Sequence, residues 1–452
     1  MEKYDLFVIG GGSAGLKTAR TVARAGWRVA VAEERELGGE CYWAGCVPTK
    51  AMVRAAEVWR LVQHAGEFGV NVAEARADFG AAMRYKDRAV AESGGAPPRD
   101  GGLPVLGATL YREHARFESP HIVRVGRDVV SAEHILLAPG TVPAVPAIPG
   151  LAEQGYITNR EAVALKTLPS RIAVVGGGPI GLELGQVFHR FGAQVTVLEA
   201  AGRLLSAEDA EISELVEQYL TNEGMRVITG ARASAVRPAD GARAVEIQTS
   251  SGVDEVRCDA VLVATGRRVD GDALCLAAAG LGLEHGFVPV DEQLRTAQPH
   301  ILAPGDVHGG ALFTHVASYE GAVAAETLLG KPAAPDLSVV PRCTFVDPEV
   351  ASVGLTEAQA AANGEVRVLR FPFATLDRAI LYGDTRGLVK LIVEQRTSRI
   401  LGGHIVGPHA SSLIAEICVC MKAGLPVTAI SSVMHAFPTF PEAVEAAALQ
   451  AP

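Results

Sequence analysis

The sequence lacks any run of about 18 apolar residues, which is the length that a membrane-spanning helix needs. It begins with MEKYDLFVIGGGSAG, without the basic stretch, apolar stretch and cleavage site of an export signal. It also lacks a surplus of basic charge, because 41 Lys and Arg residues stand against 51 Asp and Glu residues and give a net charge of -10. We therefore expect a cytoplasmic protein that has neither a membrane nor nucleic acid as its main partner.

Cysteine is scarce and irregularly spaced, with seven cysteines in 452 residues. Such an odd, scattered set does not form the disulfide framework of a small secreted protein. Cys418 and Cys420 fall in a segment with a helical pattern and point to different faces of it, which favours core packing over a metal site. We expect no metal ligands. Only Cys41 and Cys46 lie among residues that indicate chemistry.

The length of 452 residues predicts two or three domains rather than one core. Residues 5–34 and 171–200 share one plan, in which an apolar strand, a Gly-rich turn, a helix and a second apolar strand follow each other. After about residue 335, the alternating stretches RVLRFPF and GLVKLIVEQ precede a helix around residues 410–423. These patterns predict an α/β protein with two Rossmann-like dinucleotide-binding domains and a C-terminal α+β domain. Gly- and Pro-rich residues 91–107 indicate a loop, and residues 138–150 indicate an interdomain linker.

Both repeated units carry the glycine pattern of a dinucleotide site. In such a pattern the first glycine makes the turn, the second admits the pyrophosphate, and the third lets the helix pack closely on the strand. An acidic residue at the end of the following strand binds a ribose 2′-hydroxyl and thereby favours NAD over NADP. Arg203 follows the second unit; its interpretation as solvated surface is the simpler one, but it leaves NADP open. The residues are Gly10, Gly12, Gly15 and Glu33 in the first unit and Gly176, Gly178, Gly181 and Glu199 in the second.

The segment GGECYWAGCVPTK at residues 38–50 is the most informative part of the sequence. Residues five apart on a regular helix have Cα atoms about 8–9 Å apart, whereas a disulfide spans at most about 7 Å. A Cys41–Cys46 bridge therefore needs a bent turn, for which Gly45 supplies flexibility. Pro48 suits the first turn of a helix that begins near Cys46, where the helix dipole favours a thiolate. The alternative is that the two cysteines are buried and never pair.

Taken together, these motifs resemble the pyridine nucleotide–disulfide oxidoreductases, the group that contains dihydrolipoamide dehydrogenase, glutathione reductase and mercuric reductase. The resemblance covers essentially the whole chain and includes ATGR at 264–267, APGD at 303–306, FTHVASYEG at 313–321 and FVDPEVASVGLTE at 345–357. It implies an FAD-binding domain in two parts, an NAD(P)-binding domain, and an interface domain that forms a homodimer and completes each active site with residues from the partner. The corresponding ranges are 1–145 and 266–335 for FAD, 146–265 for NAD(P), and 336–452 for the interface.

The resemblance also implies roles for individual residues. Cys41 would exchange electrons with the substrate, and Cys46 would contact the flavin as a charge-transfer thiolate. Lys50 would lie beside the flavin ring and pair with Glu183, and Asp306 would hold the ribityl chain. The helix after His315 would direct its positive end at the flavin. We expect further cofactor contacts at Gly140 and Gly266.

One departure from the family pattern concerns the base that serves the exchanging thiol. The disulfide reductases of the family carry a histidine directly before Pro-Thr near the C-terminus, followed by an orienting glutamate. Here the sequence is HAFPTFPE at 435–442, so Glu442 is present but Phe437 occupies the histidine position. His435 lies two residues earlier and would be displaced by about 6–7 Å along an extended chain. Its structural role is the simpler interpretation, and replacement of the base is the alternative.

Three functions remain open from the sequence. The first is an FAD-dependent NAD(P)H oxidoreductase whose small-molecule electron acceptor needs no base, such as a quinone or a soft metal ion. The second is a dihydrolipoamide dehydrogenase or related disulfide reductase. The third is a non-catalytic, flavin-bound redox sensor. A mercuric reductase would tolerate the missing base, since thiolates hold Hg(II), but the chain ends in ALQAP without a terminal cysteine pair.

Overall fold

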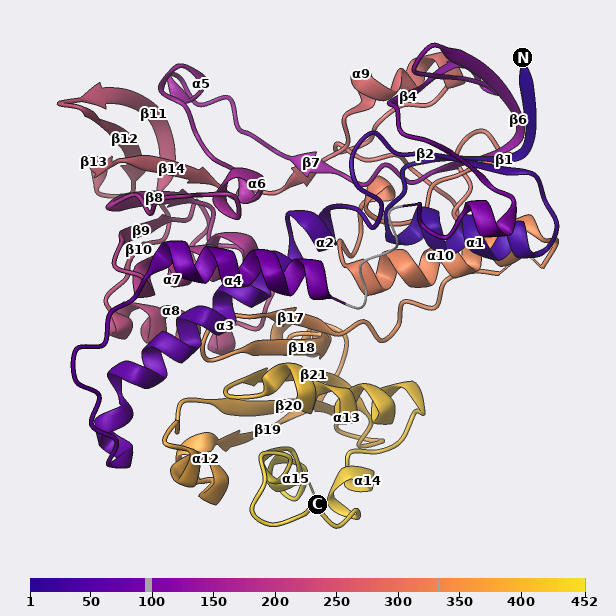
Figure 1. Ribbon diagram of the computed structural model, residues 1–452. Coiled ribbons are helices and arrows are strands. Elements are labelled where there is room, and N and C mark those ends of the chain that lie inside the picture. The colour runs from indigo at the N-terminus through magenta and orange to yellow at the C-terminus, as the bar shows by residue number, and fades with distance from the viewer. Residues whose placement is uncertain (94–99, 332, 452) are drawn as a thin grey trace. The chain divides into compact units, whose positions relative to one another are not determined.

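The computed structural model describes residues 1–93, 100–331 and 333–451 (Figure 1). The chain forms two compact units, which are described separately. The first unit comprises Met1–Ala51, Tyr85–Ala144 and Gly266–Asp336, and the second comprises Met52–Arg84, Val145–Thr265 and Leu337–Pro452. The loop expected at 91–107 is described only in part, because residues 94–99 lie outside the described residues; before them α4 (Phe79–Glu92) ends, and after them a short 3₁₀ turn covers Pro104–Leu106.

The first unit is built on one mixed sheet with the order β3-β2-β1-β6-β5-β4, and β16 pairs with β6. The pairs β1–β2, β2–β3, β1–β6 and β6–β16 are parallel, whereas β4–β5 and β5–β6 are antiparallel. Strand β1 is buried on both faces from Leu6 to Ile9, which explains its continuous apolar run. The strands are β1 (Glu2–Ile9), β2 (Val29–Ala32), β3 (Thr109–Tyr111), β4 (Ala115–Ser119), β5 (Ile122–Val125), β6 (Asp128–Leu137) and β16 (Ile301–Leu302).

Two helices of the first unit, α1 (Ser13–Arg24) and α10 (Thr314–Leu328), lie side by side (Figure 1). They approach so closely that a Cβ on Gly321 would lie 2.6 Å from the carbonyl oxygen of Ala14. Thr18 on α1 donates its hydroxyl hydrogen to the carbonyl oxygen of Gly321 at 2.7 Å. Ala14, Thr18 and Gly321 therefore let α10 pack directly against α1.

The second unit contains the second βαβ repeat. Its sheet has the order β10-β9-β8-β14, all parallel, and an antiparallel sheet β11-β12-β13 adjoins it in sequence. Helix α7 (Pro179–Arg190) follows β8, and α8 (Ala210–Glu223) follows β9. The strands are β8 (Arg171–Val175), β9 (Gln194–Leu198), β10 (Arg226–Ile228), β11 (Arg232–Ala239), β12 (Ala242–Thr249), β13 (Gly252–Cys258) and β14 (Ala260–Val263), and the short helices are α5 (Leu151–Gln154) and α6 (Asn159–Ala162).

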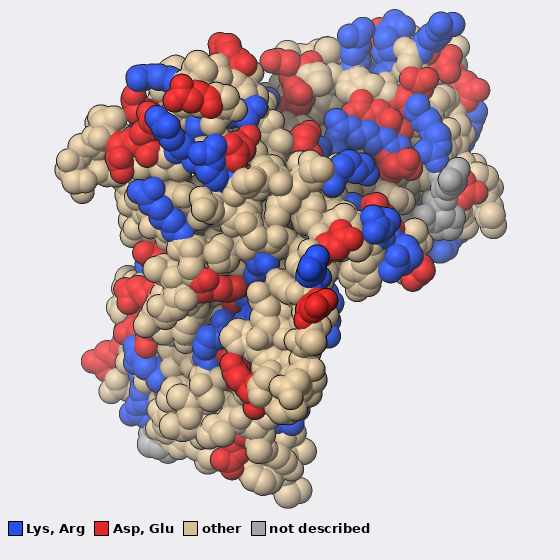
Figure 2. Space-filling view, turned by 60° about the vertical axis from the view of Figure 1, so that its left-hand side comes forward, with Lys and Arg blue, Asp and Glu red and all other residues tan. Residues whose placement is uncertain are grey.

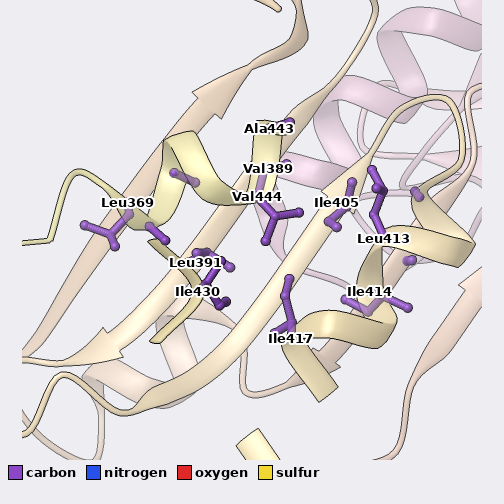
Figure 3. Packing of buried hydrophobic residues seen from close by; sticks show 14 of the residues in the cluster. Leu369, Val389, Leu391, Ile405, Leu413, Ile414, Ile417, Ile430, Ala443 and Val444 are labelled. Carbon is purple, nitrogen blue, oxygen red and sulfur yellow. The ribbon is translucent and has the colours of Figure 1, made fainter. Parts of the chain in front are cut away.

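The C-terminal part of the second unit is an antiparallel sheet with the order β17-β18-β21-β20-β19 and several helices. Side chains from β19, β20 and β21 pack against residues of α13, α14 and α15 to form one core (Figure 3). Cys420 belongs to this core and Cys418 packs against it, which confirms the packing role expected for both. The elements are β17 (Arg342–Thr344), β18 (Val350–Gly354), α11 (Glu357–Ala361), β19 (Val366–Pro372), α12 (Asp377–Tyr382), β20 (Leu388–Glu394), β21 (Ile400–Val406), α13 (Ala410–Lys422), α14 (Thr428–Ser431) and α15 (Glu442–Ala448).

These elements confirm the predicted fold class of two Rossmann-like domains with a C-terminal α+β domain. The predicted strands around RVLRFPF and GLVKLIVEQ are β19 and β20, and the helix expected around 410–423 is α13. Within the described part of the chain, no helix combines the length and apolarity needed to cross a bilayer. On the face shown in Figure 2, basic and acidic side chains are interspersed rather than segregated by sign.

Candidate functional site

The two cysteines of the central segment lie on different helices. Cys41 is the second residue of the short helix α2 (Glu40–Trp43), and Cys46 begins α3 (Cys46–Gln63). Gly45 lies between the helices, and a Cβ there would come within 3.1 Å of the carbonyl oxygen of Glu40 and 3.3 Å of the Cα of Cys41. The bend expected from the disulfide geometry is therefore present, and glycine permits its tight packing.

Two residues on either side of Gly45 stabilise this turn. Trp43 donates its indole hydrogen to the carbonyl oxygen of Leu37 at 2.9 Å. Pro48 is the third residue of α3, in the first turn, where its missing N–H leaves no helical hydrogen bond unmade. A hydrogen bond from Trp43 therefore fixes the turn before Cys46, and Pro48 is compatible with the helix that begins at Cys46.

The Cys41 and Cys46 side chains are joined by a hydrogen bond rather than by a disulfide. This hydrogen bond, together with burial, raises the pKa of Cys41 well above its ordinary value. Cys46 Sγ also lies 3.7 Å from the hydroxyl oxygen of Thr314, the first residue of α10. The pKa of the Cys41 thiol is therefore raised, and Cys46 lies close to the N-terminus of a long helix.

The first glycine motif forms a cradle of the expected kind. A Cβ on Gly10 would lie 2.2 Å from the carbonyl oxygen of Ala138, and a Cβ on Gly15 would lie 2.0 Å from that of Gly10. At Gly12, by contrast, the nearest described atom would be 3.9 Å away, so the space over this glycine is open to a ligand. Glu33 accepts a hydrogen bond from the backbone N–H of Gly11 at 2.8 Å, which ties the acidic residue to the glycine turn.

The second motif repeats this geometry. A Cβ on Gly176 would lie 2.3 Å from the carbonyl oxygen of Ala264, and one on Gly181 would lie 2.2 Å from that of Gly176. Gly178 again faces open space among the described residues. Glu199 accepts hydrogen bonds from the N–H of Gly177 and from that of Ala201, each at 2.6 Å. Both cradles therefore fit a dinucleotide at the middle glycine.

A pocket of about 170 Å³ adjoins the first cradle, within the first unit. Predicted cofactor residues Gly10, Glu33 and Gly140 line it, and so do His114 and Thr141, which the sequence did not single out. Thr141 donates its hydroxyl hydrogen to Asp306 at 3.4 Å. Burial raises the pKa of the Asp306 carboxyl, and the positive charge of Arg267 opposes that rise. The structure thus brings most of the predicted FAD residues of the first unit into one region.

The turn that carries Asp306 is fixed by Glu320, a fully buried residue of α10. Its Oε2 accepts a hydrogen bond from the N–H of Gly305 at 2.7 Å and lies 2.9 Å from Nε2 of His308. Gly305 has a φ of +81°, a conformation that favours glycine. Glu320 belongs to the FTHVASYEG segment, so its motif was visible in the sequence but this contact was not.

The C-terminal segment 435–442 carries Phe437 at the position where the disulfide reductases have the base. Phe437 is 73% exposed in the single chain. His435 Nε2 lies 3.1 Å from a carboxylate oxygen of Glu416, and its Nδ1 lies 3.0 Å from the carbonyl oxygen of Val433. Glu442 accepts a hydrogen bond from the N–H of Thr439 at 2.5 Å and so braces the turn before α15. Both ring nitrogens of His435 are therefore engaged within its own domain, as expected of a structural residue.

Four further predicted residues are described one by one. Lys50 lies on α3 in the first unit, and Glu183 lies on α7 in the second. The Glu183 carboxylate is buried and accepts a hydrogen bond from the N–H of Phe345 at 2.8 Å. His315 is exposed, is the second residue of α10, and stacks on Phe313 with ring centroids 5.3 Å apart. Gly266 has a φ of +133° and accepts a backbone hydrogen bond from Ala144. The pairing of Lys50 with Glu183 stays a prediction.

Comparison with known proteins places this geometry in a family. The pyridine nucleotide-disulphide oxidoreductase family matches residues 4–321, and its dimerisation domain matches residues 340–448. The dihydrolipoyl dehydrogenase of Bacillus subtilis (strain 168) is 34% identical over 99% of this chain and 98% of its own length. The mercuric reductase of Staphylococcus aureus is 35% identical over 99% of this chain and 82% of its own length.

Solved structures give a similar result. The Cu(II) complex of the HOCl-induced flavoprotein disulfide reductase RclA from Escherichia coli superimposes with a TM-score of 0.89 at 30% identity, covering 100% of both chains. Enzymes of this kind bind FAD and NAD(P), and both glycine cradles found here fit such cofactors. The chain therefore belongs to the pyridine nucleotide–disulphide oxidoreductase family and is an FAD- and NAD(P)-binding oxidoreductase.

Proposed function

We propose that this enzyme uses the Cys41–Cys46 pair to pass electrons from NADH to an acceptor that requires no proton-shuttling base. We rank a soft metal ion above a quinone as this acceptor, and we rank Cu(II) first among metal ions. The observation that carries the proposal is that Phe437 occupies the position of the base, while the hydrogen bond to Cys46 and burial raise the pKa of Cys41. Thiol–disulfide exchange needs a thiolate as nucleophile. A Cys41 thiol with a raised pKa and without a base is therefore poorly suited to a disulfide substrate.

The proposed residue roles follow the geometry of the two cradles. Gly10, Gly12, Gly15 and Glu33, with Gly140 and Asp306, hold FAD, and Gly176, Gly178, Gly181 and Glu199, with Gly266, hold the nicotinamide cofactor. Lys50, paired with Glu183, and the N-terminus of α10 near His315 stabilise negative charge at the flavin ring. FAD held there would supply hydride acceptance from NADH and two-electron transfer to the disulfide. Two electrons and one proton would convert the disulfide into the Cys41 thiol and the Cys46 thiolate, in line with the raised pKa of Cys41.

Return of the pair to the disulfide completes the proposed cycle. With Cu(II), one thiol, one thiolate and two Cu²⁺ ions give the disulfide, two Cu⁺ ions and one released proton. Soft sulfur ligands favour copper in its reduced state, so two cysteines at the end of a helix suit this acceptor. The related RclA structure is itself a Cu(II) complex, and the mercuric reductase relatives are named for another soft metal.

The experiment that tests the proposal is steady-state NADH oxidation by the holoenzyme with Cu(II), a quinone and lipoamide in parallel. We expect Cu(II) or the quinone to be turned over faster than lipoamide. Cys41→Ser and Cys46→Ser should each remove the metal-dependent part of this activity. Lipoamide turnover that equals or exceeds that of the other acceptors would reject the proposal.

A dihydrolipoamide dehydrogenase is the second candidate, because several relatives with 34–37% identity carry that name. The same acceptor comparison decides between the two. A non-catalytic redox sensor is the third candidate, and an anaerobic spectrum tests it. If NADH leaves the bound flavin fully oxidised in the absence of air, both enzyme functions fail.

We predict that NADH is used in preference to NADPH. Arg203 donates hydrogen bonds to the carbonyl oxygens of Ser206 and Glu208 at 2.9 and 3.1 Å, so its guanidinium is engaged by the backbone. Glu199 presents negative charge where a 2′-phosphate would lie. We expect kcat/KM to be at least about tenfold higher with NADH, which corresponds to about 1.4 kcal/mol. Glu199→Gln should narrow this ratio, whereas equal kcat/KM values in the unchanged protein would contradict the prediction.

We also propose a homodimer, supported by the match of residues 340–448 to a dimerisation domain. The division into 1–145, 146–265, 266–335 and 336–452 stays a proposal as well. The compact units group residues by packing and combine the second cradle with the C-terminal sheet, so they do not separate these four ranges.

A further inference from the structure

An ion pair in the first unit joins the redox-active turn to a distant strand. Arg267, on β15 (Arg267–Arg268), donates from Nη1 and Nη2 to the two carboxylate oxygens of Glu40 at 3.1 and 2.9 Å. The two side chains are only 15% and 17% exposed. A bidentate, mostly buried pair of this kind has a defined geometry, unlike a surface ion pair.

Arg267 makes two further hydrogen bonds, both to Thr141. Its Nε donates to the Thr141 hydroxyl at 2.7 Å, and its Nη2 donates to the Thr141 carbonyl oxygen at 2.8 Å. Because the hydroxyl accepts from Arg267, its single hydrogen is directed to Asp306, 3.4 Å away. Strand β15 pairs with β7 (Val142–Pro143), so the strand ladder also holds Arg267 and Thr141 in place.

Glu40 in turn is tied to the cysteines through its backbone. It is the residue directly before Cys41 and the first of α2. Its carbonyl oxygen accepts a hydrogen bond from the N–H of Ala44 at 2.8 Å, and Gly45 packs against it with no room for a side chain. A shift of Glu40 therefore moves Cys41 and the bend before Cys46 with it.

We propose that Glu40 and Arg267 are positioning residues, which keep the Cys41–Cys46 turn in a fixed position relative to Thr141 and Asp306. The inference rests on the proposed function, in which two electrons and one proton convert the disulfide of this pair to thiol and thiolate. Electron delivery to a disulfide depends on the placement of its sulfur atoms, and a displacement of about 1 Å can lower the rate of a positioned reaction about 100-fold. Glu40 and Arg267 set that placement through the backbone of the turn.

The test uses the FAD-loaded, full-length protein and measures the rate at which NADH generates cysteine thiols, by rapid quench and thiol titration without any acceptor. Glu40→Gln keeps the size of the side chain but removes its charge, and we expect a rate about tenfold to 100-fold lower. Arg267→Lys keeps the charge but loses the bidentate geometry, and should act in the same direction. The midpoint potential of the cysteine pair, measured in dithiothreitol buffers, should shift in both variants, which a loss of stability alone would not cause.

Two controls separate positioning from general damage. Glu2→Gln removes the exposed Arg28–Glu2 ion pair of the same unit, and should change neither the rate nor the potential. The double variant Glu40→Gln/Arg267→Lys should be no slower than the slower single variant within about threefold, since residues of one pair do not act additively. FAD content is measured for every variant, and Glu40→Asp, which keeps the charge, should recover part of the rate.

The results distinguish this inference from the proposed function. If unchanged protein forms thiols with NADH while Glu40→Gln and Arg267→Lys match its rate and potential, the positioning role is wrong. If unchanged protein forms no thiols, the proposed use of the cysteine pair fails. Should Glu40→Gln not retain FAD, Arg267→Lys decides the outcome.

Discussion

Phe437→His is expected to raise NADH-dependent lipoamide turnover by about 10²-fold or more, the usual contribution of a general acid–base. In the unchanged protein, the hydrogen bond to Cys46 and burial raise the pKa of Cys41. His435 contacts Glu416 and the Val433 carbonyl oxygen, which favours a structural role over that of the base. Steady-state assays with lipoamide at saturating NADH measure the effect.

The pH dependence supplies an independent readout. A raised thiol pKa means that the Cys41 thiolate becomes available only as pH rises, by about tenfold per pH unit below the pKa. Lipoamide turnover of the unchanged protein should therefore increase steeply between about pH 7 and about pH 9, and the increase should be shallower in Phe437→His. Phe437→Leu, which removes the ring without adding a base, serves as the matched control and should gain nothing. His435→Gln should leave lipoamide turnover as it is; a large loss would show that His435 is the base after all.

Lys390→Met is expected to lower the free energy of unfolding by about 3–5 kcal/mol, the range found when one partner of a buried ion pair is removed. Lys390 is 2% exposed, and its Nζ lies 2.6 Å from Asp209, 2.9 Å from Glu211 and 2.7 Å from Glu357. Glu211 and Glu357 are partly exposed, so solvent screens them and the buried Asp209 carries most of the cost. Denaturant unfolding followed by circular dichroism measures the difference.

The sign of the pH effect follows from the pKa of Asp209. Burial favours the neutral acid, but the hydrogen bond and charge of Lys390 outweigh it and lower the pKa of this carboxyl. Its stabilising contribution is therefore present above the unfolded-state pKa of about 4 and is lost as pH falls through the lower folded-state value. Lys390→Met should lose this acid-range slope. The double variant Lys390→Met/Asp209→Asn should recover most of the stability, and its failure to do so would show that the pair is not the source of the loss.

The local elements were predictable because their signals are local. Strands β1 and β8 are buried apolar runs followed at once by glycine turns, and α1 and α7 begin where those turns end. The same holds for β19, β20 and α13, whose alternation and helical pattern extend over single segments. The bend between Cys41 and Cys46 was also predictable, since helix geometry excludes a disulfide at that spacing.

Contacts between distant segments were not predictable in this way. Glu40 and Arg267 are 227 residues apart, and Cys46 and Thr314 are 268 residues apart. Arg267 belongs to the ATGR motif and Glu40 directly precedes Cys41, but neither sequence position predicts which residue the side chain contacts. His435 shows the same limit, because its sequence position left open a catalytic role that its contact with Glu416, 19 residues earlier, argues against.

The sequence by itself therefore determined the family, the two nucleotide cradles and the departure at Phe437, since each depends on residue identity at short spacing. Only the tertiary structure decided that the pKa of Cys41 is raised, that His435 contacts Glu416, and that Arg267 joins the redox turn to Thr141 and Asp306. The physical reason is that burial and hydrogen-bond partners, which set a pKa and hold a side chain, come from segments that chain folding alone brings together.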